Sequence, residues 1–314
     1  MIELNDVSKR FGQNFAVRGL TLSVPAGQIY GLLGHNGAGK STAIGMMLGQ
    51  VWPTAGVVRI CGHEVHSQRQ RALSDVGAIF ESPAFYDFLS GFRNLAILSS
   101  YTAPVSRGRI EEVLEWVGLT GCERAKVRTY SHGMRARLAL AQALLPKPKL
   151  LILDEPSDGL DPEGIHDMRQ TIQRLHRELG LTILLSSHFL AEVEQLCGRI
   201  AVLNRGKLVF EGSILDTRAR VQRIRLETSD FDAATRHLLA AGLISGAVEP
   251  GIVNLRDGVG TETVIQELVR ARIPLSELCR EHQTLEQFYL ALMSEERRSR
   301  AGKSNTANVS PAST

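Results

Sequence analysis

The spacing of hydrophobic residues along this chain predicts alternating strands and helices. Apolar runs bounded by glycine and proline predict strands at 2–7, 20–24, 28–33 and 57–60. Residues 150–153 are apolar at every position, which is typical of a parallel strand covered on both faces, and 182–186 predicts another buried strand. The helical periodicity of apolar residues predicts helices at 40–48, 109–117, 134–145, 163–179 and 191–196. A pair of short strands is predicted at 199–203 and 207–210. This alternation predicts an α/β core built in layers.

Composition changes near residue 216, where arginines accumulate and the apolar periodicity weakens. We therefore predict a first domain at 1–215, with a mostly helical part at about 82–145, and a linker at 216–222. The next elements are strands predicted at 224–227 and 252–255 and helices predicted at 231–241, 263–271 and 285–293. They predict a small α+β unit at 223–295, and the polar residues 296–314 predict a disordered tail.

Composition and charge exclude several classes of protein. The 314 residues include 36 basic and 33 acidic ones, and the net charge of +3 gives no reason to expect nucleic acid as a partner. No apolar run approaches the roughly 20 residues that span a bilayer, and residues 1–6 lack the features of a secretory signal. The four cysteines are far apart, which predicts reduced thiols rather than a disulfide or a zinc site.

A phosphate-binding loop follows the predicted strand 28–33. The motif G-x-x-x-x-G-K-S is formed by Gly34, His35, Asn36, Gly37, Ala38, Gly39, Lys40 and Ser41, and we add Thr42 as an expected nucleotide contact. Glycines let the backbone N–H groups and the helix N-terminus face an anion. Lys40 would place positive charge against the outer phosphates, and Ser41 would bind magnesium. A purely structural glycine-rich turn is the alternative.

Two carboxylates follow the buried strand at 150–153. Asp154 is placed to hold magnesium beside the phosphate loop. Glu155 comes next and, because neighbouring strand residues point to opposite sides, its carboxylate can face an attacking water as a general base. A solvated acidic turn is the alternative for this pair.

These motifs resemble those of the ATP-binding cassette (ABC) ATPases, and the resemblance covers about residues 1–215. The signature loop of that family resembles the segment from Tyr130 to Met134, in which Ser131 and Gly133 are retained and His132 and Met134 depart from the usual pattern. A hydroxyl and a small backbone donor at a helix N-terminus suit a γ-phosphate. His132 is left open between a phosphate contact and a space-filling side chain.

The resemblance also assigns roles to residues outside the two motifs. Asp161 resembles the aspartate that communicates between two subunits, and His188 resembles the switch histidine that contacts the γ-phosphate. Phe11 resembles the aromatic residue that stacks on adenine, although a core phenylalanine is the alternative.

Glu81 stands where the family usually has a glutamine that touches magnesium and the lytic water. The resemblance therefore makes Glu81 a metal ligand and a catalytic candidate. A glutamate here, followed by Pro83, Phe85 and Tyr86, resembles bacitracin-exporting and lantibiotic-immunity ATPases. The alternative is that Glu81 is a neutral local variation that says nothing about the cargo.

The resemblance implies a complete architecture and function. It implies a P-loop NTPase cassette with an N-terminal antiparallel β subdomain, a RecA-like core and a helical signature subdomain, followed by the small α+β unit. Two such cassettes, expected as a homodimer, would clasp ATP and Mg²⁺ head to tail and drive a transmembrane permease, which docks between Glu81 and about Tyr101. We therefore expect an exporter subunit, peripheral at the cytoplasmic face of the membrane, with antimicrobial peptides or antibiotics as cargo.

Other classes fit the sequence less well. A soluble ABC ATPase acting on the ribosome or DNA is the main alternative, but ribosomal members would carry two cassettes, and this chain has one phosphate loop. A DNA-repair ATPase would need sustained heptads between Lys40 and Asp154, and none is seen. A phosphoryl-transfer kinase would not need the signature loop. A GTPase is disfavoured because residues 204–207 do not reproduce its guanine-reading motif.

Overall fold

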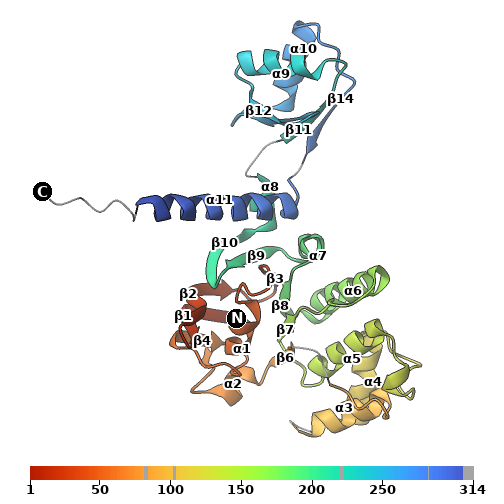
Figure 1. The fold of residues 1–314 in the computed structure, drawn as a ribbon. Coiled ribbons are helices and arrows are strands. Elements are labelled where there is room, and N and C mark those ends of the chain that lie inside the picture. Colours follow the sequence, from red (N-terminus) through yellow and green to blue (C-terminus); the bar gives the residue numbers. More distant parts are fainter. Residues whose placement is uncertain (81–83, 102–103, 220–222, 282, 307–314) are drawn as a thin grey trace, which may run out of the picture. The chain divides into compact units, whose positions relative to one another are not determined.

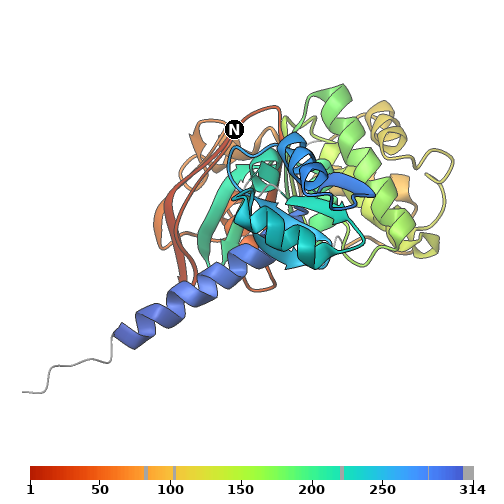
Figure 2. The same cartoon turned by 90° about the horizontal axis from the view of Figure 1, so that it is seen from above.

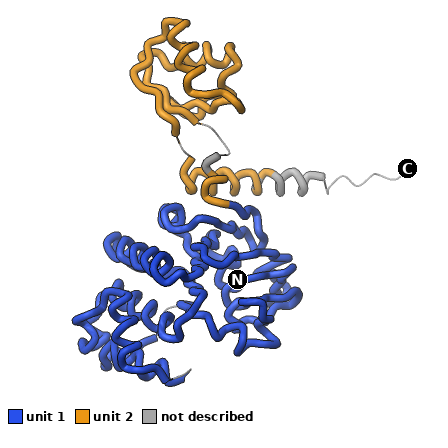
Figure 3. The backbone as a smooth tube through the Cα atoms, turned by 180° about the vertical axis from the view of Figure 1, so that it is seen from behind, with its two compact units in different colours: residues 1–212 blue, residues 213–314 orange. Residues whose placement is uncertain are grey.

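The computed structural model describes residues 1–80, 84–101, 104–219, 223–281 and 283–306. The chain divides into two compact units, Met1–Gly212 and Ser213–Thr314, which Figure 3 colours separately. The division falls three residues before the end of the predicted first domain at 215. No helix in the part of the chain that the structure describes is both long enough and apolar enough to cross a membrane.

A six-stranded sheet forms the centre of the first unit. Its strands, in spatial order, are β10 (Lys207–Ser213), β9 (Arg199–Asn204), β3 (Ile29–Leu33), β8 (Thr182–Ser187), β7 (Leu150–Asp154) and β6 (Val76–Ile79). Strand β8 pairs in parallel with β3 on one side and with β7 on the other. Every residue of these three strands is buried, which explains why hydrophobic residues follow one another in them without alternation.

A second, antiparallel sheet is built from the N-terminal strands. Its order is β2 (Asn14–Val24), β1 (Ile2–Phe11), β4 (Ala55–Ile60) and β5 (His63–Glu64). Strands β1 and β2 run further than their predictions at 2–7 and 20–24, because several register shifts interrupt the alternation that marks a strand. The inner faces of both sheets share one hydrophobic core with helix α1 (Lys40–Met47), in which Ile44 and Met47 are fully buried.

A helical subdomain lies between β6 and β7 in the sequence. It contains α3 (Gly91–Ser100), α4 (Arg107–Trp116) and α5 (His132–Leu144), after a short α2 (Arg69–Leu73) in the preceding segment. The three longer helices share one kind of N-terminal cap, a serine whose hydroxyl accepts a backbone N–H, at Ser90, Ser106 and Ser131. Figures 1 and 2 show this subdomain and the antiparallel sheet on opposite sides of the first unit.

Two more helices flank the central sheet. Helix α6 (Pro162–Leu179) begins at an Asp161 cap with proline in its first turn, and it ends at Gly180, whose φ of 65° is left-handed. Helix α7 (Leu190–Leu196) follows β8 directly. Both helices therefore start just beyond the carboxyl ends of sheet strands, where ligands bind in open α/β sheets.

The second unit has a sheet and a hydrophobic core of its own. Its elements are α8 (Ile214–Ala219), β11 (Arg223–Glu227), α9 (Phe231–Ala240), β12 (Ile244–Glu249), β13 (Ile252–Leu255), α10 (Thr261–Arg270), β14 (Glu277–Glu281) and α11 (Leu285–Thr306). The sheet order β12-β13-β11-β14 and the βαββαβ sequence between β11 and β14 are those of a ferredoxin-like unit. Its core includes Ile224, Leu238 and Val264.

The structure differs from the sequence-based expectation at two connecting segments of this unit. Residues 216–222 are predicted as a linker, yet α8 occupies 214–219, with Thr217 fully buried. The tail predicted from 296 also starts inside α11, which continues to Thr306. Glu, Arg, Ala and Lys are good helix formers, so a polar composition does not prevent a helix there. The remainder of the predicted tail, 307–314, lies outside the described residues.

Candidate functional site

The phosphate loop connects β3 to α1 through backbone conformations that favour glycine. Gly37 and Gly39 have φ values of 80° and 105°, in the left-handed region. A Cβ at Gly39 would also lie 2.5 Å from the carbonyl oxygen of Ala16. The two glycines therefore let the loop turn tightly into α1, with its N–H groups at the helix N-terminus, where an anion binds.

Lys40 is held in place by two oxygen acceptors. Its side chain is only 5% exposed, and Nζ donates to the Gly34 carbonyl at 2.7 Å. The same Nζ lies 3.1 Å from Oε1 of Glu155. A buried cation needs such partners, and here they fix the ammonium group over the phosphate loop.

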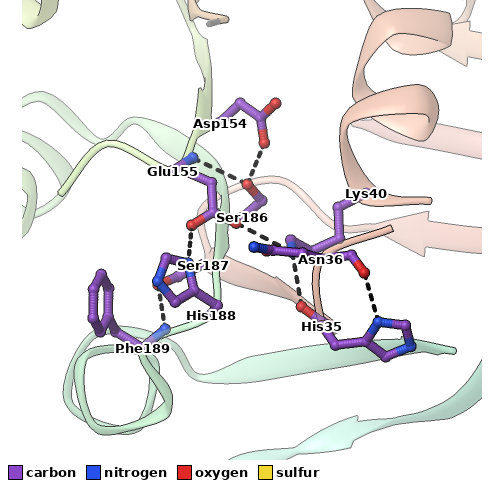
Figure 4. Close-up of polar contacts among 10 residues, drawn as sticks. His35, Asn36, Lys40, Asp154, Glu155, Ser186, Ser187, His188 and Phe189 are labelled. Atoms are coloured by element: carbon purple, nitrogen blue, oxygen red, sulfur yellow. Dashed lines mark hydrogen bonds and ion pairs between the residues drawn. The ribbon is translucent and has the colours of Figure 1, made fainter. Parts of the chain in front are cut away.

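Asp154 and Glu155 diverge at the end of β7. The Ser186 hydroxyl, from the paired position on β8, donates to Asp154 Oδ1 and accepts the Glu155 N–H at 3.0 Å. Glu155 has a φ of 49°, which is rare for a residue with a side chain and turns the chain out of the strand. The two carboxylates point to different places (Figure 4), but through this turn and not through the strand alternation on which the prediction relied.

His188 completes a chain of contacts at this edge of the sheet. Its Nδ1 donates to Glu155 Oε2, and its ring packs on Phe189 with centroids 4.1 Å apart. Because a carboxylate only accepts hydrogen bonds, Nδ1 carries the proton. Figure 4 shows that Glu155 contacts Lys40 and His188 at once, although these residues come from three different segments.

These groups line a cavity of about 630 Å³. The residues around it are Phe11, Ala16, His35, Asn36, Gly37, Ala38, Gly39, Lys40, Ser41, Thr42, Glu155, Asp158 and His188. The volume lies within the range of small-molecule sites. Ala16 and Asp158 were not predicted, although Asp158 stands in the loop that directly follows the Asp-Glu pair.

The structure decides between the two interpretations of Phe11. Phe11 lines the cavity and is 53% exposed, so it is not a core residue. Lys9 Nζ lies 4.9 Å from the ring centroid, as in a cation–π contact. This arrangement fits an aromatic surface on which a base can stack.

His35 is anchored to a residue that the sequence analysis missed. Nε2 lies 3.2 Å from Asn204 Oδ1, at the end of β9, and Nδ1 lies 2.7 Å from the Asn36 carbonyl. Asn204 is buried, and no motif marks it.

The remaining predicted residues are not brought into this cavity. Ser131 caps α5, with its hydroxyl accepting the Met134 N–H at 3.2 Å, and the space beside Gly133 is open to 3.9 Å. Asp161 caps α6 by accepting the Gly164 N–H at 3.0 Å. Asp154 is not among the residues that line the cavity, and Glu81 lies outside the described residues.

Together, the fold and this site define a P-loop nucleotide-binding cassette. Comparison with known proteins agrees: a family model described as ABC transporter matches residues 17–158. The bacitracin transport ATP-binding protein BcrA of Enterococcus faecalis is 37% identical over 300 residues, which cover 93% of this chain and 96% of that protein. An uncharacterized ABC transporter ATP-binding protein of Bacillus subtilis (strain 168), YhcH, is 45% identical over 216 residues, 69% of this chain and 71% of that protein.

The same fold is found in a dimeric ATP-binding cassette solved in a post-hydrolysis state with ADP and Pi. The match covers 68% of this chain and 99% of that one, with a TM-score of 0.61 and 23% identity. The chain belongs to the ABC transporter family. It is an ATP-binding protein of that family, which couples ATP hydrolysis to transport.

Proposed function

We propose that this chain is the motor subunit of an exporter, and that Lys40, Glu155 and His188 act on the terminal phosphate of ATP. The observation that carries this proposal is the contact of Glu155 with both other side chains at one cavity. Lys40 supplies positive charge to the outer phosphates. Glu155 orients the attacking water and accepts its proton, and His188 holds the γ-phosphate. Phe11 offers its exposed ring to adenine.

Magnesium fits the donor set of the same site. No group of three or more His, Cys, Asp and Glu side chains could hold a metal ion by itself in the described part of the chain. Mg²⁺ suits such a site, because it is usually bound by one or two carboxylates and completes its shell with phosphates and water. We assign Ser41, Asp154 and Glu81 as its ligands. Bound there, the ion would neutralise charge on the phosphates.

The signature residues require a second cassette. Ser131 and Gly133 are not among the residues that line the nucleotide cavity of their own chain, yet they stand at an exposed helix N-terminus suited to phosphate. A head-to-tail homodimer would bring them to the ATP of the partner. The dimeric arrangement of the solved cassette described above supports this proposal.

An exposed aromatic cluster favours a membrane partner at the helical subdomain. Phe88 is 67% exposed, Tyr101 is 74% exposed, and Tyr86 contacts both of them around α3. Large aromatic side chains are enriched in protein interfaces. We propose that a permease docks on Tyr86, Phe88 and Tyr101 and holds the chain at the cytoplasmic face of the membrane.

The cargo that we propose is an antimicrobial peptide or antibiotic of the bacitracin kind. The support is the similarity to BcrA over nearly the whole length of both proteins, together with the sequence pattern that begins at Glu81. A role on the ribosome or DNA has no comparable support.

Co-purification with the permease, followed by reconstitution in liposomes, tests the proposal. We expect bacitracin to stimulate ATP hydrolysis in the wild type and not in Glu155→Gln, while an unrelated peptide of similar size has no effect. The Phe88→Ser variant should hydrolyse ATP alone but lose the permease. An active chain that binds no membrane protein would contradict the exporter role.

A further inference from the structure

Glu192 is a buried carboxylate that has no part in the proposed function. It lies on α7, four residues after His188, and is only 7% exposed. Its Oε1 atom is buried and has no hydrogen-bond partner in the described part of the chain. Burying a carboxylate with incomplete hydrogen bonding costs free energy, so its presence here calls for a specific reason.

The surroundings of Glu192 come from both loops that carry the proposed catalytic groups. Ser157, two residues after Glu155, and Ser187, next to His188, form hydrogen bonds with its carboxyl group. Both serines are themselves buried. Glu192 therefore joins the loop after β7 to the end of β8.

Backbone hydrogen bonds make these two serines suitable anchors. The turn after β7 is closed by the Asp158 N–H, which donates to the Glu155 carbonyl at 3.1 Å. The Ser187 hydroxyl accepts the Phe189 N–H at 2.9 Å, so its own hydrogen remains available for Glu192. A shift of either serine would consequently move the neighbouring Glu155 or His188.

The groups around Glu192 offset only part of the effect of burial on the pKa of its carboxyl group. Burial raises the pKa of Glu192. The hydrogen bond from Ser157, the charges of Arg169 and His188 and the hydrogen bond from Ser187 lower it only in part. The charged carboxylate therefore stabilises the folded chain less than a neutral side chain of the same size would.

We propose that Glu192 is a positioning residue for ATP hydrolysis, because its carboxyl group fixes the loop of Glu155 relative to the strand end of His188. This inference rests on the proposed roles of Glu155 and His188. A carboxylate accepts the serine hydroxyls in charge-assisted hydrogen bonds, whereas an amide oxygen accepts weaker ones and alanine accepts none. Lys40 and the phosphate loop belong to other elements, so Glu192 should affect the chemical step and not nucleotide binding.

The test compares Glu192→Gln with Glu194→Gln in the full-length chain. The control removes the same charge from the same helix, two positions further on. For Glu192→Gln we expect kcat to fall by about tenfold to a hundredfold, the usual scale for small misplacements of reacting groups. The KM for ATP and the dissociation constant of a fluorescent ATP analogue should stay within about twofold. Glu194→Gln should keep the wild-type kcat.

A double-mutant cycle separates positioning from simple stabilisation. If Glu192 acts through Ser157, adding Ser157→Ala to Glu192→Gln should lower kcat no further than Glu192→Gln alone. A wild-type kcat in Glu192→Gln, a loss of nucleotide binding in parallel with kcat, or additive effects of the two substitutions would overturn the inference. A wild-type chain without ATPase activity would instead contradict the proposed function itself.

Discussion

Lys40 Nζ lies 3.1 Å from Glu155 Oε1, so the cation of the phosphate loop is paired with the carboxylate that follows β7. Lys40 begins α1 after the phosphate loop that follows β3, and β3 is not a neighbour of β7, since β8 lies between them in the sheet. Glu155 has a φ of 49°, so the chain turns out of β7 at the residue that makes the contact. In the proposed function, a γ-phosphate bound by Lys40 would compete for this ion pair and leave Glu155 available to a water molecule.

Replacing Lys40 by alanine should strongly weaken ATP binding. Hydrogen bonds to charged groups contribute about 1.5–3 kcal/mol each, so losing the ammonium group should weaken ATP by at least about tenfold to a hundredfold. Fluorescence titration with an ATP analogue measures this. Lys207→Ala, which removes an exposed lysine outside the cavity lining, should bind like the wild type. Equal affinity of both variants would remove Lys40 from the site.

The Glu155→Gln variant should bind ATP but hydrolyse it at least about a hundredfold more slowly, because general bases contribute about 10²–10⁴-fold. We expect ATP to hold this variant as a dimer, which size-exclusion chromatography with light scattering detects. Glu163→Gln, at an exposed position in the first turn of α6, is the matched control. A monomeric Glu155→Gln in saturating ATP would contradict the head-to-tail dimer.

Ser131→Ala and Ser106→Ala remove the same kind of helix cap, at the same hydrogen-bond distance of 3.2 Å. Each should lower the free energy of unfolding by about 1 kcal/mol, as measured by urea denaturation. Only Ser131→Ala should also lower the ATPase rate, because only this hydroxyl is expected to face the partner's phosphate. Equal ATPase rates in the two variants would leave Ser131 with a structural role alone.

The two left-handed glycines of the phosphate loop should respond differently to alanine. Both substitutions introduce a left-handed alanine, which costs about 1–2 kcal/mol. Gly39→Ala adds a contact of 2.5 Å with the Ala16 carbonyl oxygen, whereas a Cβ at Gly37 meets no atom within 4 Å. Without nucleotide, urea unfolding should therefore show a larger loss for Gly39→Ala. A larger loss for Gly37→Ala would contradict this loop geometry.

Glu192 should make stability depend on pH. The folded chain holds the pKa of this carboxyl above its ordinary value of 4.5, so between the two values the folded state binds more protons than the unfolded state. The free energy of unfolding then falls as pH rises through that window. Thermal melts from pH 4 upward should show the wild type losing stability relative to Glu192→Gln until the folded pKa is passed. A constant difference would indicate an ordinary pKa.

Local sequence suffices for several features of this protein. The phosphate loop lies within eight consecutive residues, between a wholly apolar strand and a helix, so its glycines and Lys40 can be recognised without a fold. The same holds for the Asp-Glu pair after β7. Local patterns did not predict the helices α8 and α11, which occupy parts of the predicted linker and polar tail. Good helix formers and a few buried contacts suffice for these helices, and they leave no clear apolar periodicity.

Tertiary structure alone decided how these parts meet. The contacts of Glu155 with Lys40 and His188 depend on the spatial order of β3, β8 and β7, which sequence spacing does not encode. The burial of Glu192 carries no motif at all, and neither does that of Asn204. A hydrogen bond between distant segments depends on where the packed sheet places their backbones. The amino-acid sequence by itself therefore determined which chemical groups are present and how each local element is formed, whereas packing decided which groups face one another.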